Sequence, residues 1–134
     1  MSKYMRLKEE AAMQSDASIN QELTRGSVVF VKNNQPNGHI MKGNHPAVII
    51  QNNIGNKYSP TVIVCYLTSQ LKRLDMKTHV LLQHYDNLKI SVVQAEQIVT
   101  INKSDILSVA TKLRTEDITR VDAAVRVSLG LEAA

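Results

Sequence analysis

The sequence is poor in cysteine and in aromatic residues. Among its 134 residues, Cys65 is the single cysteine, and the aromatic residues are one phenylalanine and four tyrosines, with no tryptophan. One cysteine excludes an internal disulfide and is typical of a protein from a reducing compartment. The length favours one domain with a core of its own, and that core has to be built from Val, Ile and Leu.

Long apolar runs are also missing. None approaches the roughly 18 residues that a membrane helix needs, and the N-terminus begins with mixed charges instead of a signal peptide. We therefore expect a cytoplasmic protein that does not associate with a membrane.

Several kinds of catalytic site lack their characteristic residues. The four histidines and one cysteine are scattered without metal-ligand spacing, and there is no glycine-rich phosphate loop or nucleophile elbow. Residues 25–89 contain two acidic groups, Asp75 and Asp86, which disfavours hydrolysis by a pair of carboxylates. No metal ion or other cofactor is predicted.

The positive charge is concentrated in the middle of the chain. Residues 25–89 hold eight Lys/Arg against two acidic residues, a charge of +6, whereas residues 1–24 (three against four) and 90–134 (five against six) each sum to −1. A polyanion could bind such a segment. A lysine-rich solvated surface is the alternative interpretation.

The pattern of apolar residues and turns predicts several short strands followed by one long helix. Strands are expected within 27–32, 46–52, 61–69, 78–83 and 89–101, with a connection over 53–60. Ser104 is expected to cap a short helix over 103–113. Residues 1–24 are interpreted as a helical or mobile extension, and residues 25–134 as the domain proper. The fold class is α+β, mainly β: a small, partly open antiparallel barrel closed by the C-terminal helix.

The C-terminal helix is predicted over residues 115–130. Thr115 can cap it, Glu116 and Asp117 suit the positive end of its dipole, and Gly130 can end it. Its apolar face is expected to consist of Ile118, Val121, Val125 and Leu129.

Cations, imidazoles and hydroxyls are the reactive groups that remain. They gather in the basic middle: His39, Lys42, His45, Thr68, Ser69, Lys72, Arg73, Lys77, Thr78 and His79. Such groups suit phosphodiester chemistry, because imidazole moves protons near neutral pH and cations stabilise charge that develops on phosphorus. Cleavage of RNA needs the fewest groups from a protein, since the RNA's own 2′-hydroxyl can be the nucleophile. A histidine in a loop is nevertheless more often a surface residue than a catalyst.

Five segments together resemble the MazF/PemK family of toxins from toxin–antitoxin pairs. In order from Arg25 to Leu131 they are "RGSVVFVK", "HPAVIIQNNIGNKYSPTVIVCYLTS", "THV", "AEQIVTI" and "VDAAVRVSLGL". The resemblance implies an SH3-like barrel of the CcdB/MazF type, a twofold homodimer, and a metal-independent endoribonuclease that cuts single-stranded RNA at short sequences. It also implies a MazE-like antitoxin whose acidic, initially disordered tail covers the RNA groove.

The resemblance also assigns roles to individual residues. The family's catalytic threonine matches Thr68, and Gln97 matches a glutamine that contacts RNA in relatives. The family's N-terminal Arg-Gly matches Arg25-Gly26, for which a turn and strand start is the simpler interpretation. The complete set expected to contact RNA is Arg25, His39, Lys42, Ser69, Lys72, Arg73, Lys77, His79 and Gln97.

His45 is where the chain departs from the family pattern. Members usually carry Arg-Pro where this chain has His45-Pro46, and that arginine belongs to the catalytic pair. Guanidinium is always charged, whereas imidazole is mostly neutral at pH 7. Three outcomes are open: His45 transfers protons in RNA cleavage, Lys42 or Arg73 supplies the missing charge, or catalysis has been lost. A module that binds RNA or its antitoxin without efficient cleavage is therefore the alternative function. The gyrase poisons of the related fold match less well.

Overall fold

The computed structural model describes residues 23–32 and 44–133. Most of the predicted N-terminal extension, residues 1–22, and residues 33–43 lie outside this description. The described elements, in chain order, are β1 (Ser27–Val31), β2 (His45–Ile49), α2 (Asn53–Tyr58), β3 (Thr61–Thr68), β4 (His79–Leu82), β5 (Ser91–Asn102), a 3₁₀ turn (Lys103–Asp105), β6 (Ile106–Lys112) and α3 (Thr115–Ser128).

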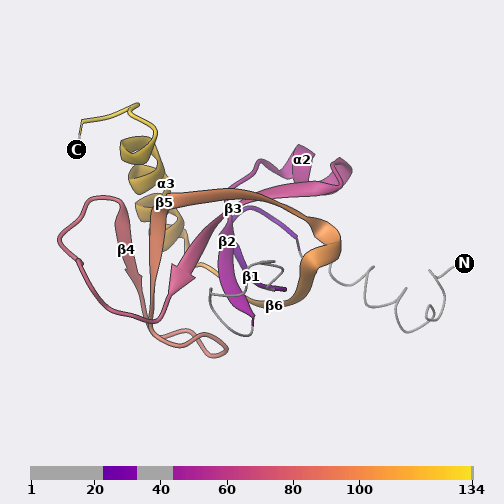
Figure 1. Ribbon diagram of the computed structural model, residues 1–134, viewed down its shortest axis with the longest axis horizontal. Helices are drawn as coiled ribbons and strands as arrows, with labels where there is room; N and C mark the ends of the chain where they lie inside the picture. The colour runs from indigo at the N-terminus through magenta and orange to yellow at the C-terminus, as the bar shows by residue number, and fades with distance from the viewer. Residues whose placement is uncertain (1–22, 33–43, 134) are drawn as a thin grey trace, which may run out of the picture.

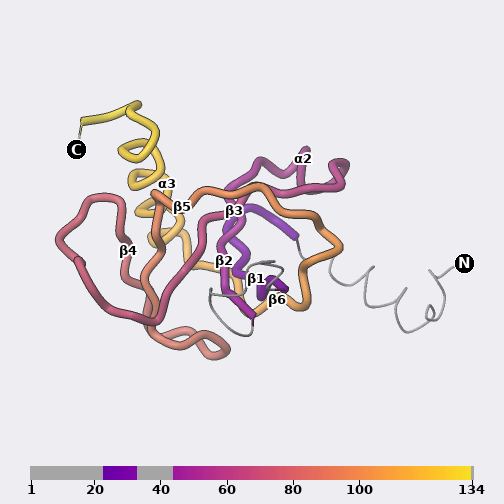
Figure 2. Tube along the Cα trace, in the orientation of Figure 1, coloured from indigo at the N-terminus to yellow at the C-terminus, as the bar shows by residue number. Residues whose placement is uncertain are grey.

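The strands form one six-stranded antiparallel sheet in the order β4-β5-β3-β2-β1-β6. The sheet is not closed, because β4 and β6 are its two edges and do not pair with each other. Figure 1 shows α3 beside β4 and β5 at the left of the sheet, with α2 at the right. The Cα trace in Figure 2 brings β1, β2 and β6 together in the middle of the molecule. The predicted class, mainly β with a C-terminal helix and a partly open antiparallel barrel, is confirmed.

Two apolar clusters hold the sheet, as expected for strands that alternate their side chains between two faces. One cluster packs Val121 and Ala124 of α3 against strand residues such as Val48 and Leu67. The other consists of Leu23, which precedes β1, and of strand residues: Val29, Val31, Ala47, Ile49, Val62, Val64, Ile101 and Ile106. Both are rich in valine, as the scarcity of aromatic residues requires.

Three local predictions were wrong. The expected connection contains α2, because Asn52 accepts a hydrogen bond from the Gly55 amide (2.8 Å) and thereby caps a short helix. The expected helix over 103–113 is a 3₁₀ turn followed by β6, since pairing with β1 outweighs the capping signal. Thr115 is the first residue of α3 and not its cap, which is Arg114.

The apolar face of α3 is confirmed except at its end. Val121 is buried, and Ile118 and Val125 pack against the first cluster. Leu129, however, is 58% exposed, because the helix ends at Ser128 and Gly130 follows with a φ of 77°. In the described part of the chain, no helix is both long and apolar enough to span a membrane.

Candidate functional site

His45 and Thr68 come together because one strand begins where its neighbour ends. His45 is the first residue of β2, and Thr68 is the last residue of β3. The two strands are antiparallel, with Ala47 opposite Tyr66. Continuing that register by two residues places His45 opposite Thr68, with both side chains and that of Tyr66 on one face of the sheet.

The imidazole of His45 is packed into the strand surface. The residue is 8% exposed, and its ring centroid lies 5.7 Å from that of Tyr66, with the planes tilted by 55°. Burial lowers the pKa of His45 below the ordinary value for imidazole, because the charged form loses its hydration. The ring is therefore neutral at pH 7. In that form it can accept a proton but provides no fixed positive charge.

Thr68 is half-buried, and as the last residue of β3 it directly precedes the loop to β4. Its Oγ1 accepts a hydrogen bond from the Gln70 amide at 3.1 Å. A hydroxyl has one proton and two lone pairs. This contact uses a lone pair and leaves the proton for a hydrogen bond to another acceptor.

The basic loop, residues 69–78, joins β3 to β4. Lys72, Arg73 and Lys77 are exposed on it. The Arg73 guanidinium forms two hydrogen bonds to the carboxylate of Asp75, at 3.1 and 3.2 Å. Its charge is thus largely matched within the loop, which weakens the hypothesis that Arg73 replaces the family arginine at His45.

A wide bulge in β5 carries Gln97. Between the pairs Cys65↔Ile98 and Leu67↔Val93, two steps along β3 correspond to five along β5. Extra residues on one strand bend it and change the direction of their side chains. Gln97 and its neighbour Glu96 lie in this bulge and are exposed.

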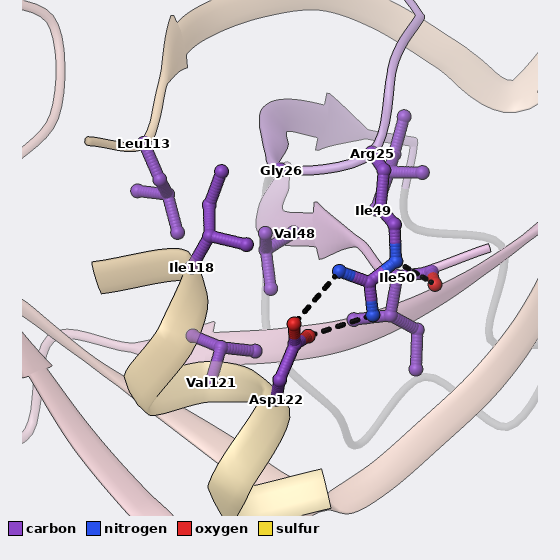
Figure 3. Close-up of a pocket in the computed structure, with 9 residues that line it drawn as sticks. All are labelled: Arg25, Gly26, Val48, Ile49, Ile50, Leu113, Ile118, Val121 and Asp122. Atoms are coloured by element: carbon purple, nitrogen blue, oxygen red, sulfur yellow. Dashed lines mark hydrogen bonds and ion pairs between the residues drawn. The ribbon is translucent and has the colours of Figure 1, made fainter. Parts of the chain in front are cut away.

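The Arg25 guanidinium joins β1 to α3. It donates to Asp122 at 3.1 and 2.6 Å and, through Nε, to the Ile50 carbonyl at 3.0 Å. Figure 3 shows this pair at the edge of a small pocket, with Ile118 and Val121 of α3 beside it. These contacts support the structural interpretation of the Arg-Gly segment, and an RNA contact by Arg25 stays a prediction.

Two described pockets lie away from His45. The pocket in Figure 3 includes Gly26 at the start of β1. A second cavity, of about 510 Å³, includes Ser27 and Lys112. His45 pairs instead with Val31, at the opposite end of β1. Among the described residues, no group of three or more His, Cys, Asp or Glu side chains could hold a metal ion.

Comparison with known proteins identifies the family. Residues 24–129 match the family described as PemK-like, MazF-like toxin of type II toxin–antitoxin system. The chain belongs to this family.

The relatives of this MazF-like chain agree with that assignment. Endoribonuclease EndoA of Bacillus subtilis (strain 168) is 38% identical over 109 residues, which cover 80% of this chain and 94% of EndoA. An endoribonuclease in complex with its cognate antitoxin, from a mycobacterial species, superposes with a TM-score of 0.69 at 22% identity, covering 84% of this chain and 99% of that one. MazE–MazF (Form-II) of Deinococcus radiodurans gives 0.68 at 20% identity, covering 82% and 97%. The last two similarities show the MazF fold.

The described structure thus brings part of the predicted site together. His45 and Thr68 share one end of the β2–β3 pair, and Ser69 begins the basic loop directly after Thr68. His39 and Lys42 lie outside the described residues. Tyr66 was missed, although its position two residues before Thr68 in a strand predicts the same face.

Proposed function

We propose that this MazF-like chain is the toxin of a type II toxin–antitoxin pair, a cytoplasmic endoribonuclease that cleaves single-stranded RNA. One observation supports the reaction most directly: in a chain of this family, β2 begins at His45 and β3 ends at Thr68, and the β2–β3 register, continued by two residues, puts the two side chains on one face of the sheet. An imidazole can accept the proton of the RNA's own 2′-hydroxyl, and a hydroxyl can donate a hydrogen bond to the phosphate.

The proposed reaction begins with proton transfer to His45. Its neutral imidazole takes the proton of the 2′-hydroxyl while that oxygen attacks the adjacent phosphorus. The Thr68 hydroxyl donates a hydrogen bond to a nonbridging oxygen, where negative charge develops. The bond between phosphorus and the 5′-oxygen then breaks, the 5′-oxygen takes a proton from water, and a 2′,3′-cyclic phosphate remains.

The proposed partners are RNA, a second copy of the chain and an antitoxin. Relatives are named as endoribonucleases, and solved structures include MazF bound to antitoxin. The +6 charge of residues 25–89 suits both an RNA strand and the acidic disordered tail of a MazE-like protein. RNA and antitoxin therefore compete for one surface. Simultaneous binding without mutual weakening would contradict this.

A second candidate function is binding without efficient cleavage. The observation in its favour is that His45 is buried and neutral where the family carries a permanently charged arginine. Both candidates predict RNA binding, so cleavage alone distinguishes them.

Incubation of the full-length protein with a long RNA, without divalent metal, tests the proposed function. We expect cuts at a short recurring sequence, mapped by primer extension. Thr68→Val is the matched variant, because it keeps the β-branched strand residue and removes the hydroxyl. It should lower cleavage by about a hundredfold. Binding without cuts by the unmodified protein would favour the second candidate, and absence of both would reject the two.

A further inference from the structure

His79 is held at the start of β4 by contacts on both sides of its ring. Its side chain is 8% exposed, and Nε2 lies 2.9 Å from Oε2 of Glu96 on β5. On the other side, Nδ1 lies 3.0 Å from the carbonyl oxygen of Arg73 and 3.3 Å from that of Lys72. The ring is thus enclosed between the basic loop and the β5 bulge.

All of these partner atoms are hydrogen-bond acceptors. A carbonyl oxygen cannot donate, and a carboxylate donates only when it is protonated. Burial by itself would raise the pKa of Glu96, but the hydrogen bonds from His79 and from its own backbone amide outweigh this and leave the pKa below its usual range. Glu96 is therefore ionised at neutral pH. Each contact therefore needs a His79 nitrogen that carries hydrogen, and the contacts on both sides of the ring form together only when both nitrogens carry it.

The His79 ring contacts the basic loop at one turn. Arg73 has a φ of 53°, in the left-handed region that few side chains occupy, and its carbonyl also accepts from the Met76 amide at 3.1 Å. The His79 amide in turn donates to the Met76 carbonyl at 3.1 Å. The ring thus anchors the turn on which Lys72 and Arg73 are presented.

Glu96 connects this anchor to the bulge. It lies in the widened part of β5 immediately before Gln97, which resemblance to the family links to RNA. One ion pair therefore joins the loop that carries Lys72 and Arg73 to the bulge that carries Gln97.

We propose that His79 is a positioning residue, whose ring bridges Glu96 and the loop carbonyls and so fixes the cations of the basic loop beside Gln97 along the path of single-stranded RNA. This rests on the proposed function for its RNA ligand. It replaces direct phosphate contact as the role of His79, because both ring nitrogens are already occupied within the protein.

The two roles of the His79–Glu96 pair, positioning of the loop and mere surface charge, predict opposite changes in RNA affinity for one substitution. Glu96→Gln removes a negative charge from a basic surface, so general electrostatics predicts tighter RNA binding. Positioning predicts the opposite: about tenfold weaker binding and a smaller slope of log affinity against log salt, as in the double variant Lys72→Gln/Arg73→Gln. His79→Gln should behave like Glu96→Gln. Glu116→Gln, which removes an exposed carboxylate from α3, is the matched control and should not weaken binding.

A measurement without RNA tests the pair itself. In ¹⁵N NMR spectra of the full-length protein at pH 7, both nitrogens of His79 should be protonated, and Glu96→Gln should abolish that state. The Met76 and His79 amides should exchange faster in Glu96→Gln but not in the control His84→Asn.

A neutral His79 at pH 7, or Glu96→Gln with unchanged or tighter RNA binding, would overturn the proposal. Absence of RNA binding by the unmodified protein would instead reject the proposed function. The NMR and exchange results would then decide whether the pair anchors the loop.

Discussion

A single residue decides which mechanism this MazF-like chain can use. His45 begins β2 in a buried position against the Tyr66 ring, where a charged guanidinium would lose hydration. A neutral imidazole fits such a surface better. Under the proposed function, the replacement of the family arginine by His45 would change the chemistry from fixed positive charge to proton transfer.

The first prediction concerns the pH dependence of cleavage. Protonation removes the base, so the rate should fall as the pH decreases. Because burial lowers the pKa of His45, the midpoint of this fall should lie below about 6.5, the value for free imidazole. Single-turnover cleavage of a short RNA between pH 5 and 8 measures it. A rate that is constant over this range would contradict a histidine base.

The second prediction concerns the His45 side chain itself. His45→Ala should lower cleavage by about a hundredfold with RNA binding nearly intact, the size expected when a general base is lost. His45→Arg restores the family residue. Retained or higher activity would mean that the position supplies charge, and collapse would mean that it transfers protons. Full activity in His45→Ala with an unaltered pH profile would leave His45 as a strand residue before a proline.

At the scale of elements, a buried carboxylate connects α3 to the segment that follows β4. Asp117 is 6% exposed and accepts hydrogen bonds from the Tyr85 hydroxyl at 2.6 Å and from Arg120 at 2.7 Å. The Tyr85 hydroxyl also accepts from the Arg114 amide, the first residue before α3, at 2.9 Å. The segment after β4 thereby fixes the start of the helix.

The third prediction measures this connection. Asp117→Asn should lower the free energy of unfolding by about 1–3 kcal/mol, because Tyr85 and Arg120 lose a charged acceptor. The loss stays moderate because the exposed guanidinium of Arg120 can still be hydrated. Glu116→Gln changes the neighbouring exposed carboxylate and should stay within about 0.5 kcal/mol. Urea unfolding at one protein concentration compares them. Equal effects of the two substitutions would show that Asp117 acts only through the helix dipole.

Strands and the long helix could be predicted from the sequence because their apolar residues recur at periods of two and about 3.6. The prediction that His45 and Thr68 lie across from each other on neighbouring strands came from the resemblance to the family. The short helix α2 depends on one side-chain cap, and β6 on a partner distant in the sequence, so their local patterns were misleading. The pairing of His79 with Glu96 could not be predicted, because it depends on the register across the β5 bulge.

At the scale of the whole molecule, the packed unit begins before the basic segment. The basic segment lies within residues 25–89, and the chain before it is slightly acidic. Leu23, however, is 4% exposed and packs in the second apolar cluster, and Thr24 accepts a hydrogen bond from Lys112 at 2.7 Å. The packed unit therefore includes at least these two residues.

The last prediction is that the chain is a homodimer formed by the sheet and the C-terminal helix, without residues 1–22. A twofold axis would join two basic segments into one longer surface for RNA. A truncated chain that begins at Gln21 retains Leu23 and should sediment as a dimer at micromolar concentration, like the full chain. A second truncation that begins at Thr24 should also be dimeric but about 2–5 kcal/mol less stable, because it loses a buried leucine side chain. A monomer from the Gln21 truncation, beside a dimeric full chain, would place the interface in the extension instead.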